Sequence, residues 1–207
     1  MAEISDGVEW TLLSLPGRHF PWRIRGNPIS WMQASDATLM QSFDTVIATS
    51  MVDLSTLIGL YPHLGSAHKV VYFHENQFAY PLAEGQQRRT EPLMVGLYSA
   101  MAADRVLFNS RFNQSTFLDG AWDFLRRMPE RVDRSVIDRI ERKSTVIPVP
   151  LAAPIISQDC AREPGLLLWN HRWEYDKNPE AFFAACRCLK AWGIDFKLAV
   201  VGQTFRQ

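Results

Sequence analysis

The chain has 207 residues, of which 47% are hydrophobic and 21% are charged. These proportions are typical of a soluble globular protein with one full core and part of a second, and they exclude a mainly disordered chain. Lys and Arg together number 22, as do Asp and Glu, so the net charge of zero excludes a global attraction to nucleic acid or membranes. Any polyanion site must therefore be a local patch.

The first residues, MAEISDGVEW, are acidic and lack the apolar core of a secretory signal peptide. No apolar run in the sequence approaches the ~20 residues that a helix needs to span a bilayer. The three cysteines do not have the spacing of a disulfide framework or a zinc site. We therefore expect a cytoplasmic protein with no membrane partner.

Short apolar runs alternate with longer amphipathic stretches along the first three quarters of the chain. The runs predict strands buried on both faces, and the stretches between them have helical spacing. Asp53 and Ser110 are typical N-cap residues where a strand gives way to a helix. This alternation predicts a doubly wound α/β domain with a parallel sheet over residues 1–150. The expected strands are 10–15, 44–49, 69–73, 105–108 and 145–149, and the expected helices are 30–42, 53–60, 91–103, 110–125 and 131–143.

A proline-rich segment, residues 151–164, has neither a helical nor a strand period and is predicted to be an interdomain linker. After it the alternation begins again, with an expected strand at 166–169, a helix at 179–192 and a strand at 196–201. One βαβ unit leaves both sheet edges exposed. We therefore expect residues 165–207 to be the incomplete beginning of a second Rossmann-like domain.

Consecutive polar residues, His74, Glu75 and Asn76, directly follow the expected strand 69–73. In open α/β sheets, ligands bind in the crevice beyond the carboxyl ends of the strands, and this is where the three side chains fall. They are the candidate catalytic residues. The alternative is a loop in which the histidine is a capped or core residue with no ligand.

Arg172 and Lys177 lie between the strand at 166–169 and the helix that begins near Pro179. The amino-terminal end of a helix favours anions through its free backbone N–H groups and its dipole, and the two cations add to this effect. The pattern predicts a diphosphate site. The alternative is an exposed loop with balanced charges, in which Glu174 and Asp176 pair with the two cations.

The segment PGRHFPWRIRG interleaves aromatic residues with Arg18, Arg23 and Arg25, a pattern typical of single-stranded nucleic-acid contacts. A second basic stretch covers residues 126–143, with seven basic and four acidic residues. It is interpreted either as a solvated helix face or as an RNA contact. The first segment is the better candidate for RNA.

The positions of Arg172 and Lys177, five apart after a proline-rich linker, resemble the Gly-Arg-Leu-x-x-x-Lys-Gly pattern of GT-B glycosyltransferases. Three longer motifs, YFHENQFAYP, ADRVLFNSRFNQSTFL and LLLWNHRWEYDKNPEAFF, are similar to the tRNA-queuosine mannosyltransferase family, and the similarity covers nearly the whole chain. The sequence departs from the family in lacking a first strand and a glycine-rich loop, of the form Glu-Pro-Tyr-Tyr-Gly-Gly-Ser-His, before Trp10. The carboxylates that hold the donor sugar are also missing, so we expect the chain to be truncated at both ends.

The resemblance implies a GT-B fold of two Rossmann-like domains and transfer of mannose from GDP-mannose to queuosine in tRNA, with retention and without a metal or other cofactor. It further implies that His74 lines the acceptor side, that Glu75 and Asn76 orient it or hold sugar hydroxyls, and that Arg172 and Lys177 hold the donor diphosphate. We expect the fragment itself to be inactive. Two alternatives stay open: a related glycosyltransferase with another donor or acceptor, and a non-catalytic nucleotide-binding module.

Overall fold

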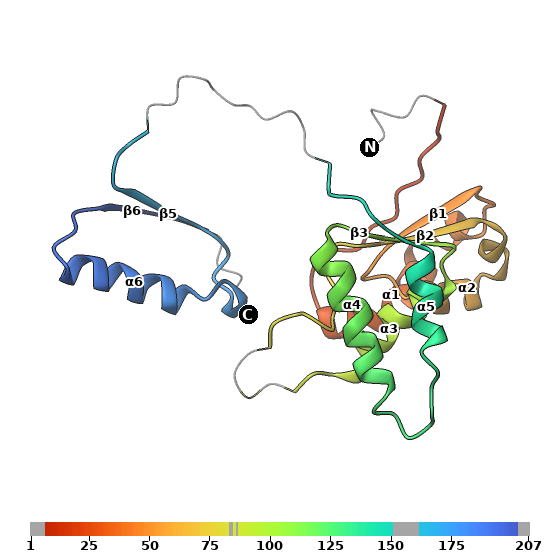
Figure 1. Ribbon diagram of the computed structural model, residues 1–207. Helices are drawn as coiled ribbons and strands as arrows, with labels where there is room; N and C mark the ends of the chain where they lie inside the picture. Colours follow the sequence, from red (N-terminus) through yellow and green to blue (C-terminus); the bar gives the residue numbers. More distant parts are fainter. Residues whose placement is uncertain (1–6, 83–84, 86, 151–161, 203–207) are drawn as a thin grey trace. The chain divides into compact units, whose positions relative to one another are not determined.

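The computed structural model describes residues 7–82, 85, 87–150 and 162–202 (Figure 1). The chain divides into two compact units. Unit 1 comprises residues 1–80 and 89–149, and unit 2 comprises residues 81–88 and 150–207. Each unit is described by itself. Most of the predicted linker, 151–164, lies outside the described residues.

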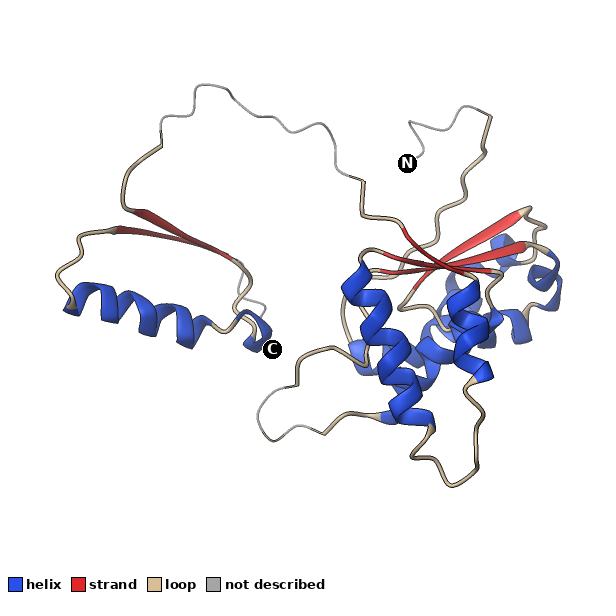
Figure 2. Ribbon diagram, in the orientation of Figure 1, coloured by secondary structure: helices blue, strands red, loops and turns tan. Residues whose placement is uncertain are grey.

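Unit 1 is built on a four-stranded parallel sheet in the order β1-β2-β3-β4. Each strand pairs with the strand before it in the chain, so all the crossovers run in one direction. With the usual right-handed connection, such crossovers put every connecting helix on the same face. Figure 2 shows the helices gathered on that face. The prediction of a parallel α/β fold is confirmed, but the doubly wound arrangement is not seen among the described residues. The elements are α1 (Phe20–Leu39), β1 (Thr45–Thr49), α2 (Leu54–Leu60), η1 (Pro62–Ser66), β2 (His68–Phe73), α3 (Thr90–Ala102), β3 (Arg105–Phe108), α4 (Arg111–Leu125), α5 (Ser135–Arg142) and β4 (Ser144–Val146).

The predicted strand at 10–15 is wrong, because this segment is irregular coil. Its leucines Leu13 and Leu15 are partly buried against a small hydrophobic cluster on α1, α2 and η1. The apolar side chains therefore pack although the backbone does not pair with a strand. Packing of alternate side chains in an extended coil gives the same period of two as a strand.

Helix α1 begins ten residues earlier than the prediction of 30–42. Pro28 has no N–H to donate to the carbonyl of Ile24, and a proline in this position normally breaks a helix. Here the side chain of Asn27 compensates, because its Nδ2 donates to the carbonyls of Arg23, at 2.7 Å, and of Ile24, at 3.4 Å. The same amide donates to the Met51 carbonyl at 3.0 Å and thereby ties α1 to the turn after β1.

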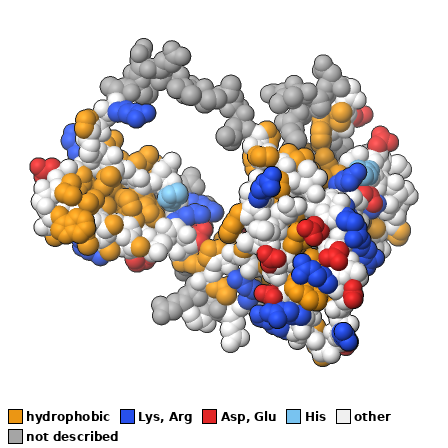
Figure 3. All heavy atoms as spheres, viewed as in Figure 1, with side chains coloured by type: hydrophobic (Ala, Val, Ile, Leu, Met, Phe, Trp, Pro, Cys, Tyr) orange, Lys and Arg blue, Asp and Glu red, His pale blue; other side chains and the backbone are white. Residues whose placement is uncertain are grey.

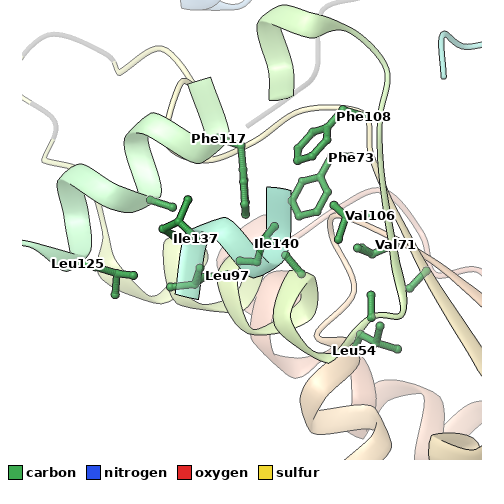
Figure 4. Close-up of a cluster of buried hydrophobic side chains, with 14 residues drawn as sticks. Leu54, Val71, Phe73, Leu97, Val106, Phe108, Phe117, Leu125, Ile137 and Ile140 are labelled. Atoms are coloured by element: carbon green, nitrogen blue, oxygen red, sulfur yellow. The ribbon is translucent and has the colours of Figure 1, made fainter. Parts of the chain in front are cut away.

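The main core lies between the sheet and the helix layer. Phe73 from β2 stacks on Phe108 from β3, with ring centroids 5.0 Å apart, and Phe117 from α4 packs against both (Figure 4). All three rings are at most 1% exposed. The strand ends are therefore held in place by buried aromatic contacts from two layers.

Both predicted N-caps are confirmed. The carboxylate of Asp53 accepts from the Thr56 N–H at 3.1 Å at the start of α2, and the hydroxyl of Ser110 accepts from the Asn113 N–H at 3.1 Å at the start of α4. Each cap fixes the residue at which a helix begins after a strand of the sheet.

Unit 2 contains β5 (Leu166–Asn170), η2 (Tyr175–Lys177), α6 (Pro179–Ala191) and β6 (Lys197–Val201). Strands β5 and β6 are parallel neighbours, so the predicted βαβ unit is confirmed. Trp169 packs on Phe182 and Phe183 of α6, with centroid distances of 4.7 and 6.0 Å. Large apolar side chains remain exposed, including Trp192 and Leu168, and Figure 3 shows hydrophobic side chains spread over the visible face of this unit.

In the part of the chain that the structure describes, none of the helices has the length and apolar character that crossing a membrane requires.

Candidate functional site

The predicted residues His74, Glu75 and Asn76 lie together in the loop that follows β2, at the carboxyl ends of the parallel strands. His74 and Glu75 are exposed, whereas Asn76 is buried. This loop and the starts of α2 and α4 form a polar rim at the edge of the sheet where parallel α/β folds bind ligands. We call residues 74–79 the β2 loop.

Asn76 is the anchor of the β2 loop. Its Nδ2 donates to the Oδ1 of Asn113, at 2.7 Å, and to Thr116 Oγ1, at 3.1 Å, both on α4. Its Oδ1 accepts from the backbone N–H groups of Phe78 and Ala79, at 3.1 and 3.0 Å. Both polar atoms of the amide are thus bonded within unit 1, so the side chain holds the loop against α4.

Phe78 adds a second attachment of the β2 loop to α4. The ring packs on Phe117, with a centroid distance of 5.4 Å, and lies over Gly120. A methyl group at Gly120 would lie 2.5 Å from the Cβ of Phe78, so only glycine lets the loop come this close. This contact could not be predicted from the sequence, because a glycine within a predicted helix does not indicate which residue packs against it.

His74 is positioned through its backbone. Its carbonyl accepts from the Nδ2 of Asn109, at 2.6 Å, at the end of β3. Asn109 in turn accepts from Asn113 at 2.9 Å, which also supports Asn76. The imidazole ring lies 4.7 Å from the ring of Tyr72 and remains exposed. The side chain therefore faces outward on a backbone that neighbouring asparagines fix.

We expect Asn76→Ala to lower the free energy of unfolding of the chain by about 1–3 kcal/mol, because it leaves buried partners on α4 and in the loop without their hydrogen bonds. Chemical denaturation measures this loss. The matched control is Asn170→Ala, because Asn170 is exposed on β5. Equal stability of the two variants would show that the amide of Asn76 does not anchor the loop.

Ser50, at the end of β1, was not singled out by sequence reasoning. It is only 7% exposed, and its hydroxyl has no hydrogen-bond partner among the described residues. It lines a small hollow together with Glu75, Asn76 and Gln77 of the β2 loop. Serine is common in turns after strands. Its presence at this position in a single sequence therefore does not indicate a functional site.

Arg172 and Lys177 lie in unit 2, on the connection from β5 to α6. Arg172 pairs with Glu174 at 3.2 Å, and Lys177 pairs with Asp176 at 2.8 Å. These are the pairs that the alternative interpretation of this loop expected. The first turn of α6 is capped by Asn178, whose Oδ1 accepts from the Ala181 N–H at 3.2 Å. The diphosphate site stays a prediction, and in the structure its cations are held by neighbouring carboxylates.

Gly202, directly after β6, approaches the backbone of this connection closely. A methyl group on its Cα would lie 2.1 Å from the carbonyl oxygen of His171. We expect Gly202→Ala to destabilise unit 2 by about 1–3 kcal/mol, because two backbone segments must separate. Hydrogen exchange of the β5 amides measures the effect.

Gly59→Ala on α2 is the control for this change, since a methyl group there meets no atom within 4 Å. Unchanged β5 protection in the Gly202 variant would contradict the prediction.

The predicted RNA contacts lie at the start of α1. Arg18 is exposed in the coil before the helix, and Arg23 is partly buried in its first turns. Arg25 forms a salt bridge with the buried carboxylate of Asp53, while its own side chain is 59% exposed. In the second basic stretch, Arg126 and Arg134 pair with acidic neighbours, as expected for a solvated helix face.

Within the described residues, three or more His, Cys, Asp or Glu side chains do not come together in a group that could hold a metal ion.

The fold and its polar rim define a Rossmann-like α/β protein of the kind that binds ligands at the carboxyl ends of parallel strands. The family model described as tRNA-queuosine alpha-mannosyltransferase N-terminal matches residues 1–151. A curated tRNA-queuosine alpha-mannosyltransferase of Drosophila melanogaster is 34% identical, in a match that covers 95% of this chain and 54% of the relative. The chain belongs to the tRNA-queuosine alpha-mannosyltransferase family.

The chain spans about half the length of this curated relative. No solved structure matches it.

Proposed function

We propose that this chain is part of a retaining GT-B glycosyltransferase that transfers mannose from GDP-mannose to queuosine in tRNA. The observation that carries the proposal is the match of residues 1–151 to the family model, in a chain whose β2 loop presents an exposed His74 at the carboxyl ends of the parallel strands. The proposal includes a cytoplasmic location.

The donor half of the proposal rests on Arg172 and Lys177. In the reaction, the bond between the anomeric carbon and the diphosphate oxygen breaks, so negative charge grows on the leaving GDP. Fixed cations stabilise that charge. Glu174 now pairs with Arg172, so the bound diphosphate would replace this carboxylate as the partner of the guanidinium.

The acceptor half rests on the β2 loop. His74 and Glu75 are exposed and would contact the acceptor diol, while Asn76 keeps the loop in place through α4. The new bond forms between the acceptor oxygen and the anomeric carbon, and the proton of that hydroxyl passes to the departing phosphate oxygen. This route needs no protein nucleophile, metal or cofactor.

The test is transfer of labelled mannose from GDP-mannose into queuosine-containing tRNA by a protein of the relative's full length that contains this sequence. We expect label in this tRNA and none in the same tRNA without queuosine. Equal labelling of both tRNAs would refute the queuosine acceptor. Faster transfer from another nucleotide-sugar would refute the donor, and no transfer from any donor, with binding of nucleotide retained, would favour the non-catalytic module.

A further inference from the structure

Trp22, in the first turns of α1, has an indole ring that lies flat on the helix. A methyl group at Gly26, one turn further on, would lie 2.4 Å from Cε2 and 2.6 Å from Cδ2 and Cζ2 of this ring. Three atoms of the six-membered ring at nearly equal distances mean that Gly26 faces the plane of the ring and not its edge. The glycine therefore provides the space in which the ring rests.

The orientation of the Trp22 ring is fixed by a hydrogen bond. Its Nε1 donates to the hydroxyl of Ser30 at 3.3 Å, one further turn along α1. The side chain is nevertheless 51% exposed. One face of the indole thus lies against the helix at Gly26 while a large part of the ring remains accessible, so its stacking orientation is set before any partner binds.

The sequence on either side of Trp22 is basic. Residues 10–35 include Arg18, His19, Arg23 and Arg25 and contain no Asp or Glu. Arg25 pairs with the buried carboxylate of Asp53, and Arg18 is exposed on the coil before the helix. Phe20, two residues before Trp22, is a second exposed aromatic residue.

We propose that the Trp22 ring, resting on Gly26 and held by Ser30, is a stacking platform for an unpaired base of RNA, with Arg18 contacting the adjacent phosphates. Every base has a π-face, so an exposed aromatic ring beside cations binds single-stranded nucleic acid without a sequence requirement. Protein recognition of RNA concentrates on loops, where bases are unstacked and accessible. The inference rests on the proposed function, because that function makes a tRNA the acceptor.

The experiment measures binding of the 207-residue chain to a fluorescein-labelled RNA hairpin by fluorescence anisotropy, at several salt concentrations. We expect Trp22→Ala to weaken binding about tenfold, the loss of one stacked base, and Trp22→Phe to keep most of the affinity. Gly26→Ala should weaken binding with unchanged helical circular dichroism, because the new methyl group pushes the ring off the helix. Arg18→Ala should lower the salt dependence of binding.

The matched control is Trp192→Ala, since Trp192 is 73% exposed in unit 2. This variant should bind RNA like the parent, and a fully paired duplex should bind the parent, Trp22→Ala and Trp192→Ala alike. Absence of RNA binding by the parent, parental affinity of Trp22→Ala, or an equal loss in Trp192→Ala would each overturn the inference. So would binding to anionic lipid vesicles that depends on Trp22 while RNA binding does not.

Failure of this inference is distinguishable from failure of the proposed function. Mannose transfer that persists unchanged in Trp22→Ala, together with unchanged RNA binding, would remove the platform and keep the enzyme. Loss of RNA binding in Trp22→Ala, with no mannose transfer by the parental full-length protein, would keep the platform and remove the enzyme.

Discussion

Replacing Arg172 by Ala in a protein of the relative's full length should weaken GDP-mannose binding by about 2–4 kcal/mol, because the diphosphate charge loses its partner. Lys177→Ala should have an effect of the same size. Isothermal titration calorimetry measures both. In this structure Arg172 and Lys177 pair with Glu174 and Asp176, so each substitution also leaves a carboxylate that repels the donor.

Arg187→Ala is the control for this prediction, because Arg187 is an exposed arginine on α6, the helix that follows the predicted diphosphate site. It should leave the affinity for GDP-mannose unchanged. Affinities within twofold of the parent for Arg172→Ala would show that its guanidinium serves only the charge balance of the loop.

His74→Ala in the same full-length protein should lower the rate of mannose transfer by about 10²-fold or more, with little change in donor affinity. The physical reason is the loss of a group that orients the acceptor hydroxyl or handles its proton. Labelled mannose in queuosine-containing tRNA gives the rate, and donor titration gives the affinity.

His68→Ala provides a matched control, because His68 is an exposed histidine at the opposite end of the same strand. Its variant should transfer mannose at the parental rate. Parental activity of His74→Ala would mean that the β2 loop serves the fold and that the acceptor binds elsewhere.

Elements with a local chemical signal could be predicted from the sequence. Asp53 and Ser110 cap helices because a short oxygen-bearing side chain satisfies the first backbone N–H groups, and that chemistry needs no tertiary information. The start of helix α1 could not be predicted from such local signals. Pro28 indicates a break, and the compensation by Asn27 depends on the turn after β1, which is distant in sequence.

The candidate site shows the same division. Its location followed from a polar run after a buried strand, since parallel strands end at one edge of a sheet. The role of Asn76 did not follow, because its partners Asn113 and Thr116 are brought to it by α4. The close approach of Phe78 to Gly120 likewise depends on how the β2 loop packs on α4, and the sequence of either segment alone does not indicate it.

The strand order of unit 1 also bears on how fast the chain folds. Because β2 pairs with β1, β3 with β2 and β4 with β3, every pairing in this sheet joins strands that are consecutive in the chain. Each pairing therefore closes a loop of only one crossover, and the entropy cost of closing a loop grows with its length. We expect a sheet with this order to form faster than one of equal size whose neighbouring strands are distant in sequence.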